Sequence, residues 1–238
     1  MLKFINLKSD IKQLWRDTIM AMLFLAPILI MVLFRLIISL LLPYVSTMVD
    51  SNIMQYEQYI LSLVLFISPA MLGMVMGFML IQDKDNKIVE LMSITPLGRN
   101  VYLLMRMIFV FFFSFIYTLY GYFVIGLYLI PFITVLYIAI LLSMYGAILG
   151  LLLFRVATDK VKGLTYAKGL NILMIFAFAH LADTQWITIF SAFFPSFWVT
   201  EIIMKPNDLF TLVMAAVVHL IWFGACIIGL NSAKKRTA

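Results

Sequence analysis

Long apolar runs separated by short polar stretches dominate the hydrophobic pattern of the chain. The runs are continuous rather than alternating, which favours membrane-spanning helices over the strands of an outer-membrane barrel. A helix needs roughly 20 apolar residues to cross a bilayer. On this basis we predict six spans, at about residues 19–42, 60–81, 101–121, 132–154, 169–185 and 209–230.

The composition agrees with a membrane protein. The 238 residues are 65% hydrophobic and 12% charged, whereas a water-soluble domain carries roughly 25% charged residues. Cys226 is the single cysteine, so an intrachain disulfide is excluded. The first apolar run is too long for a signal peptide and follows a mixed, charged stretch, so we expect no cleavable signal.

The distribution of charge predicts the topology. The net charge is +6, but the basic residues fall in the connections between spans, so we expect no nucleic-acid partner. Apart from Arg35 and Lys205, the Lys and Arg residues lie on one side of the six-span arrangement. Because cytoplasmic connections are enriched in basic residues, we predict a multi-pass protein of the inner or plasma membrane with both termini in the cytoplasm.

The first 18 residues mix basic and apolar positions. Lys8, Lys12 and Arg16 alternate with Ile11 and Trp15. This pattern predicts an amphipathic helix lying on an anionic inner leaflet; a basic flank without such a role is the alternative.

The longest polar break in the first half of the chain is IQDKDNKIVELMSITPLGRN, residues 81–100. An aspartate near its start can cap a helix, and Gly98 permits a turn at its end. We predict a short amphipathic helix over residues 83–95 that lies along the membrane surface. A solvated connection without further function is the alternative.

Two stripes of side chains define this predicted helix. The polar stripe consists of Asp83, Lys87 and Glu90, at positions i, i+4 and i+7. The opposite, apolar stripe contains Ile88, Leu91 and Met92.

Residues 186–204 are apolar and nearly long enough to cross, but Pro195 divides them and Glu201 lies near their end. A crossing here would place Lys234, Lys235 and Arg236 outside, against the charge bias. We therefore predict a re-entrant hairpin that enters and leaves at the outer face before the last span.

Four residues are candidates for a pore or an interface: Arg35, Gly73, Gly77 and Glu201. Arg35 is expensive in a bilayer, so it either snorkels to the outer interface or has a partner or pore-facing role. Gly73 and Gly77 form a G-x-x-x-G pair that allows close helix approach. Gly146 and Gly150 repeat this spacing in the fourth span.

Catalytic motifs are missing from the sequence. It contains no G-x-x-x-x-G-K-[ST], G-x-S-x-G or H-E-x-x-H pattern,. His180 and Asp183 share a helix face at i, i+3, but a metal site needs more ligands. We therefore expect a transport component without catalytic, metal or cofactor sites, energised from elsewhere.

The run DKDNKIVELMSITPLGRNVYLLMR resembles the inner loop of type-2 ABC exporter permeases, with Asn86 where glycine is common in that family. The PSFWVTEII segment around Pro195, the six spans and the basic N-terminal helix also agree with the family. The W-R-D of residues 15–17 and the TPLGRNVY run are similar to small drug-export permeases, including fluoroquinolone exporters.

The resemblance implies an all-α membrane fold and a defined set of partners. It implies a second permease, identical or not, and separate ABC ATPase subunits that bind ATP and magnesium. The helix between spans 2 and 3 would be a cytoplasmic coupling helix, contacting the ATPase through Asp83, Lys87, Ile88, Glu90, Leu91 and Met92. The substrate would be hydrophobic or amphipathic: a drug, a lipid or a peptide.

Two alternatives stay open at this point. One is a haem or cytochrome-assembly permease of similar size. The other is a small secondary carrier or membrane enzyme that uses His180, Asp183 or Glu201.

Overall fold

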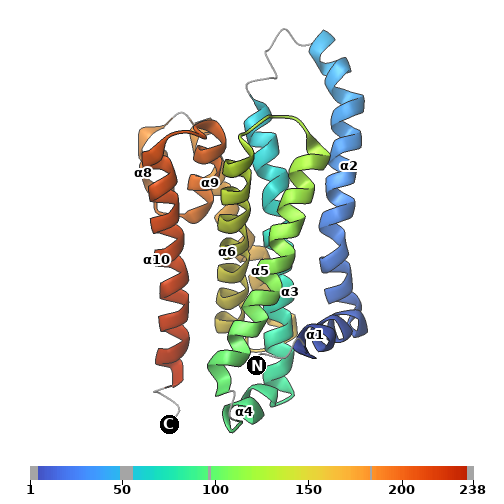
Figure 1. Ribbon diagram of the computed structural model, residues 1–238, viewed down its shortest axis with the longest axis vertical. Coiled ribbons are helices and arrows are strands. Elements are labelled where there is room, and N and C mark those ends of the chain that lie inside the picture. Colours follow the sequence, from blue (N-terminus) through green and yellow to red (C-terminus); the bar gives the residue numbers. More distant parts are fainter. Residues whose placement is uncertain (1–4, 49–55, 96–97, 183, 235–238) are drawn as a thin grey trace.

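The computed structural model describes residues 5–48, 56–95, 98–182 and 184–234, which are almost entirely helical and include no strand. The helices pack side by side into an elongated bundle (Figure 1). In chain order they are α1 (Ile5–Arg16), α2 (Thr18–Met48), α3 (Glu57–Asp85), α4 (Ile88–Ser93), α5 (Gly98–Ile125), α6 (Phe132–Val156), α7 (Lys160–Asn171), the 3-10 helix η2 (Ile172–Ala182), α8 (Gln185–Ser191), α9 (Pro195–Met204) and α10 (Leu209–Lys234).

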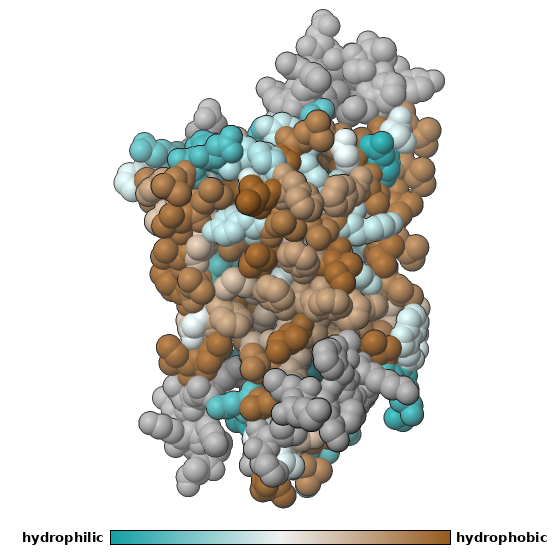
Figure 2. Space-filling view, in the orientation of Figure 1, coloured by the Kyte–Doolittle hydropathy of each residue, from teal (hydrophilic) through white to brown (hydrophobic). Residues whose placement is uncertain are grey.

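Six helical segments in these described ranges are long and apolar enough to cross a membrane. Each of them overlaps one of the six predicted spans, and the predicted all-α membrane fold is confirmed. The space-filling view shows the corresponding band of hydrophobic surface, with hydrophilic residues toward both ends (Figure 2). The six segments are Thr18–Leu41, Glu57–Asp85, Gly98–Ile125, Phe132–Val156, Lys160–Ala182 and Leu209–Gly229.

The fifth span begins earlier than the sequence indicated. We expected residues 155–168 to form a polar connection, yet the helical segment starts at Lys160. The reason is local: the Asp159 side chain accepts a hydrogen bond from the backbone N–H of Lys162 and caps α7,. The backbone departs from helical geometry at Phe178 in η2, so this segment is bent within its second half.

The two ends of the bundle carry different short helices. At one end, α4 joins α3 to α5, α1 lies across the bundle axis, and α10 finishes (Figure 1). We call this the α4 end. The opposite end holds α8, α9 and the connection from α5 to α6, and we call it the α9 end.

The predicted hairpin corresponds to α8 and α9, which meet at an angle of 112°. Pro195 occupies the first turn of α9, where its missing N–H costs no hydrogen bond. The predicted break at this proline is therefore present. Whether the pair re-enters one membrane face stays a prediction.

The two glycine pairs face each other at the centre of the bundle. A Cβ placed on Gly73 of α3 would lie 2.5 Å from the carbonyl oxygen of Gly146 on α6. A Cβ on Gly150 would lie 2.8 Å from the carbonyl oxygen of Gly73. The two backbones therefore approach too closely for any side chain, as G-x-x-x-G pairs allow.

We expect Gly73→Ala to destabilise the bundle by about 1–3 kcal/mol, because the added methyl group must force α3 and α6 apart. The free energy of unfolding in detergent micelles measures this cost. Gly224→Ala is the matched control, since a Cβ there meets no atom within 4 Å. In the control, alanine should change stability by no more than about 1 kcal/mol, in the stabilising direction. Equal stability of the two variants would contradict the close packing.

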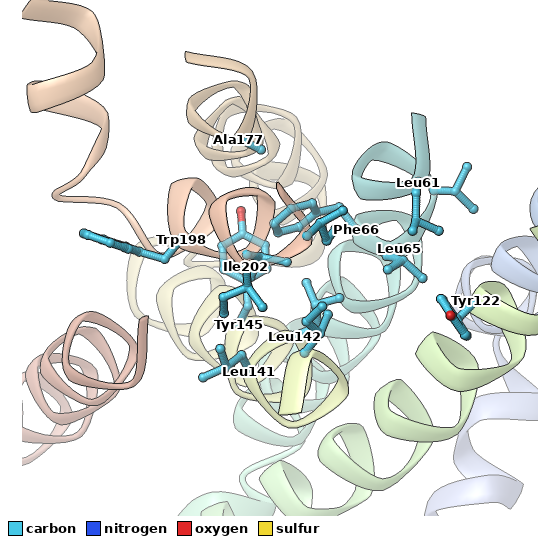
Figure 3. Packing of buried hydrophobic residues seen from close by; sticks show 14 of the residues in the cluster. Leu61, Leu65, Phe66, Tyr122, Leu141, Leu142, Tyr145, Ala177, Trp198 and Ile202 are labelled. Atoms are coloured by element: carbon cyan, nitrogen blue, oxygen red, sulfur yellow. The ribbon is translucent and has the colours of Figure 1, made fainter. Parts of the chain in front are cut away.

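Around this contact, buried apolar side chains form two clusters, one toward each end. The cluster toward the α9 end joins α3, α5, α6, η2 and α9 (Figure 3). Within it the rings of Phe66 and Tyr145 pack edge to face with centroids 5.3 Å apart. The other cluster includes Leu14 and Val89, so both α1 and α4 are anchored to the bundle by apolar contacts.

Candidate functional site

The α4 end contains a buried polar cluster centred on Arg106. This arginine lies in the third turn of α5, within a candidate membrane-spanning segment. Only 6% of its surface is exposed. A charge at such a place requires partners. They come from α1, from α3 and from α5 itself.

Arg106 donates hydrogen bonds to two carboxylates and one amide. Nη1 lies 2.7 Å from Asp10 Oδ1 on α1, and Nη2 lies 2.7 Å from Asp83 Oδ2 on α3. Nη2 also lies 2.7 Å from Gln13 Oε1. Gln13 Nε2 in turn donates to Asp83 Oδ1 over 2.9 Å, and the Tyr102 hydroxyl donates to Asp83 Oδ2. The planar, five-donor guanidinium is suited to joining several acceptors in this way.

Asp10 is buried beside Arg106 and Asp83. Loss of water around the carboxyl raises the pKa of Asp10 above its ordinary value; the charge of Arg106 opposes this, and the nearby Asp83 adds to it,. The cluster therefore holds two carboxyl groups close together, and Arg106 is paired with both of them.

Asp83 does not occupy its predicted place. We expected it to start the helix between the spans and to lie on its exposed stripe. Instead α3 continues to Asp85, and Asp83 is fully buried. The pairing with Arg106 explains the difference, because it keeps this aspartate inside the bundle and lets α3 extend by one turn. The predicted helix over residues 83–95 is correspondingly shorter, Ile88–Ser93.

The short helix α4 begins after Lys87, whose φ of 57° is in the left-handed region. Val89 is buried and anchors α4 to the bundle. Ile88 and Met92 pack against the same apolar cluster. Of the predicted apolar stripe, Leu91 is instead 58% exposed, and the following Ile94 is 83% exposed. The short helix thus presents large apolar side chains, together with the exposed Glu90, on the side away from the bundle.

A second ionic contact ties the α1–α2 corner to α7. The Asp17 carboxylate accepts the backbone N–H groups of Ile19 and Met20 and pairs with Lys160. Partial burial raises the pKa of Asp17, but the hydrogen bonds from Lys160 and Met20 outweigh this and lower it below its ordinary value. A lowered pKa means that this contact stabilises the fold at neutral pH and weakens only as the pH falls below the ordinary carboxyl range.

Comparison with known proteins gives a family. The model of the family "Fluoroquinolones export permease protein Rv2686c-like" matches residues 10–229. The chain belongs to this family. No curated protein and no solved structure matches it. The matched region begins at Asp10 and extends beyond Arg106. The whole Arg106 cluster therefore lies within the region that matches the family.

Arg35 of this permease forms a hydrogen bond within the chain. Its Nη1 donates to the carbonyl oxygen of Ile125 over 2.6 Å, at the last turn of α5. This contact satisfies a carbonyl that the helix end leaves unpaired. Among the roles that the sequence left open, Arg35 therefore has a partner within the chain. A pore-facing role stays a prediction.

Glu201 lies in a different place from the Arg106 cluster, on α9. It is buried, pairs with His180 and lies 3.2 Å from Lys205 Nζ. Asp183, the other residue considered with His180, falls outside the described residues. Within the described part of the permease, no group of three His, Cys, Asp or Glu side chains could hold a metal ion.

The sequence reasoning missed Arg106, Asp10, Gln13 and Tyr102. One signal was present, because the rule that singled out Arg35 applies equally to an arginine in the third span. The identity of its partners could not be read from spacing, since Asp10 and Arg106 are 96 positions apart.

Proposed function

We propose that this chain is the membrane-spanning subunit of an ATP-driven exporter, and that ATP hydrolysis takes place on a separate ABC ATPase subunit. Membership of an export permease family supports the transport role. The sequence contains no phosphate-binding loop of the Walker type,, which supports our assignment of ATP and magnesium to the partner. The chain itself would bind no cofactor.

The observation that carries the proposal is the exposed apolar surface of α4. Leu91 on α4 and Ile94 directly after it are large, apolar and exposed, and polar residues flank this helix on both sides in the sequence. Such side chains are typical of a protein contact site when they gather outside a membrane span. We infer that the ATPase covers α4, with Glu90 and Lys87 at the rim of the contact.

Through the Arg106 cluster, a movement of α4 would be transmitted to the bundle. The helices on either side of α4 in the sequence, α3 and α5, are joined by the ion pair between Asp83, in the last turn of α3, and Arg106, in the third turn of α5. A displacement of α4 by the ATPase would therefore move α3 and α5 together, as a rigid pair. Asp83 would act by holding this pair, and not by touching the ATPase.

The α4 end would face the cytoplasm, where an ATPase is located. The basic residues of α1 and α7, together with Arg155 in the last turn of α6, lie toward this end. This agrees with the charge bias of cytoplasmic segments. Both chain termini would then be cytoplasmic. We further propose that two permease subunits pair to form the transport path, as the family resemblance implies.

A fluoroquinolone is the first substrate to test, because the family description names this class. The proposal requires an amphipathic compound to leave the cell only when permease and ATPase are both present. Inside-out vesicles containing both subunits should accumulate a fluorescent fluoroquinolone on addition of ATP and magnesium. Accumulation that persists without the ATPase, driven by a proton gradient, would favour a secondary carrier instead.

The topology makes a separate prediction. A cysteine at Asn207, exposed beyond α9, should react with a membrane-impermeant maleimide added to intact cells. A cysteine at Asn86, exposed at the α4 end, should react only after permeabilisation. Both variants are made in a Cys226→Ala background. Labelling of Asn86→Cys from outside would refute the orientation, and protection of Asn207→Cys would refute the re-entrant hairpin.

A further inference from the structure

A polar pocket lies between α1 and the corner where α3 passes into α4. Its volume is ≈ 400 Å³. The side of α1 contributes Lys12, Gln13, Arg16 and Asp17; the opposite wall contributes Gln82, Asn86 and Ile88. Gln13 belongs both to this pocket and to the Arg106 cluster. The other residues that line the pocket take no part in the cluster.

The pocket has an excess of uncommitted positive charge. Lys12 and Arg16 are one helical turn apart and exposed, and neither has an ion-pair partner within the part of the chain that the structure describes. Asp17 does not neutralise them, because its carboxylate is already engaged by Lys160 and by two backbone N–H groups. This combination suits an anion that accepts several hydrogen bonds.

Gln82 provides an independent sign of a missing polar ligand. Its Oε1 is buried and has no hydrogen-bond partner among the described residues. A buried amide left unpaired is costly, and the two ends of a glutamine amide can exchange places by rotation. Rotation of the side chain would bring one end of this amide to the pocket, where a ligand group or its bound water would satisfy it.

Exposed apolar residues are close in sequence to the two cations of the pocket. Ile11 and Trp15 are exposed on α1 beside the two cations, and Ile19 and Met22 are exposed on the first turns of α2. A tryptophan beside basic residues is typical of the level of the lipid head groups. A soluble anion would use only the pocket, whereas a phospholipid would use both the cations and these apolar residues.

We propose that the pocket binds the phosphate group of an anionic phospholipid, with its acyl chains against Ile19 and Met22 of α2. Lys12 and Arg16 pair with the phosphate, and Gln82 and Asn86 bind the polar head group. Because Ile88 is the first residue of α4, the bound head group touches the helix proposed to contact the ATPase. The lipid site itself requires no ATPase, so it can be tested on the permease alone.

The test counts lipids that stay bound. Permease reconstituted in nanodiscs of phosphatidylglycerol and phosphatidylcholine is extracted into mild detergent, and retained lipids are quantified by mass spectrometry. Wild-type permease should retain phosphatidylglycerol in preference to phosphatidylcholine. Lys12→Gln with Arg16→Gln should lower this preference about tenfold or more, since each basic residue contributes separately to attraction of anionic lipid.

Two matched variants separate the pocket from general charge. Lys162→Gln with Lys168→Gln removes the same charge from exposed positions on α7 and should keep the preference. Lys12→Arg with Arg16→Lys keeps the charge in the pocket and should also retain it. Thermal unfolding of all three variants verifies the fold.

Three results would overturn the proposal. One is equal loss of phosphatidylglycerol in the α1 and α7 variants. A second is displacement of the lipid by glycerol 3-phosphate at matching concentration, which would indicate a site for a soluble phosphate. The third is unchanged lipid retention in the Lys12 and Arg16 variant together with lost binding of the ATPase, which would make the pocket a protein contact.

Discussion

Replacing Arg106 by methionine should unfold the α4 end of the bundle. The substitution keeps an unbranched side chain but removes the cation that pairs with Asp10 and Asp83, both of them buried. Breaking a buried ion pair by removing one partner costs about 3–5 kcal/mol, because the remaining charge is left uncompensated. The free energy of unfolding in detergent, followed by circular dichroism, should fall by this amount, and ATP-dependent export should be lost with it.

Two further variants test the cause of this loss. Lys162→Met removes an exposed pair with Asp159, 3.7 Å apart, and should cost less than about 1 kcal/mol. Adding Asp10→Asn and Asp83→Asn to Arg106→Met removes the stranded charges and should recover part of the lost stability. If the free energy of unfolding of Arg106→Met lies within about 1 kcal/mol of the wild-type value, the cluster does not hold α1, α3 and α5 together.

The spans could be predicted because their signal is local. Hydropathy over about 20 residues finds a segment without knowledge of its neighbours, and all six were found. The ends were less accurate where a polar residue belonged to the inside. At Asp83 the pattern indicated a surface helix, because nothing local shows that a carboxylate will meet an arginine 23 residues later.

The glycines and α4 show the same difference between local patterns, which the sequence reveals, and contacts between distant residues, which it does not. The sequence identified both G-x-x-x-G pairs but not that Gly73 would meet Gly146, since that requires the packing of two whole helices. Around α4 the sequence predicted an amphipathic helix between spans. It did not predict that Val89 would anchor it while Leu91 faced outward, because a helix of six residues is too short for periodicity to fix its orientation.

Leu91→Asp should separate the permease from its ATPase. Leu91 is the exposed apolar residue within α4 itself, and placing a carboxylate at the centre of an apolar contact commonly costs 2 kcal/mol or more, about thirtyfold in affinity. Glu90→Lys should act in the same direction by reversing charge at the rim. The measurements are co-purification of the ATPase and ATP-dependent export in vesicles, both expected to fall at least about tenfold.

The permease itself should fold normally in these variants, since the Leu91 side chain is exposed and the anchors Ile88, Val89 and Met92 are unchanged. Val161→Asp is the matched control: the residue is apolar, exposed, and lies in the first turn of α7, where an acidic side chain is favourable. It should leave the complex intact. Because the variants differ in position and not in the type of change, an effect confined to α4 identifies the contact site. An intact complex with full export in Leu91→Asp would mean that the ATPase's motion reaches α3 and α5 by another route, and that α4 is only a connection between spans.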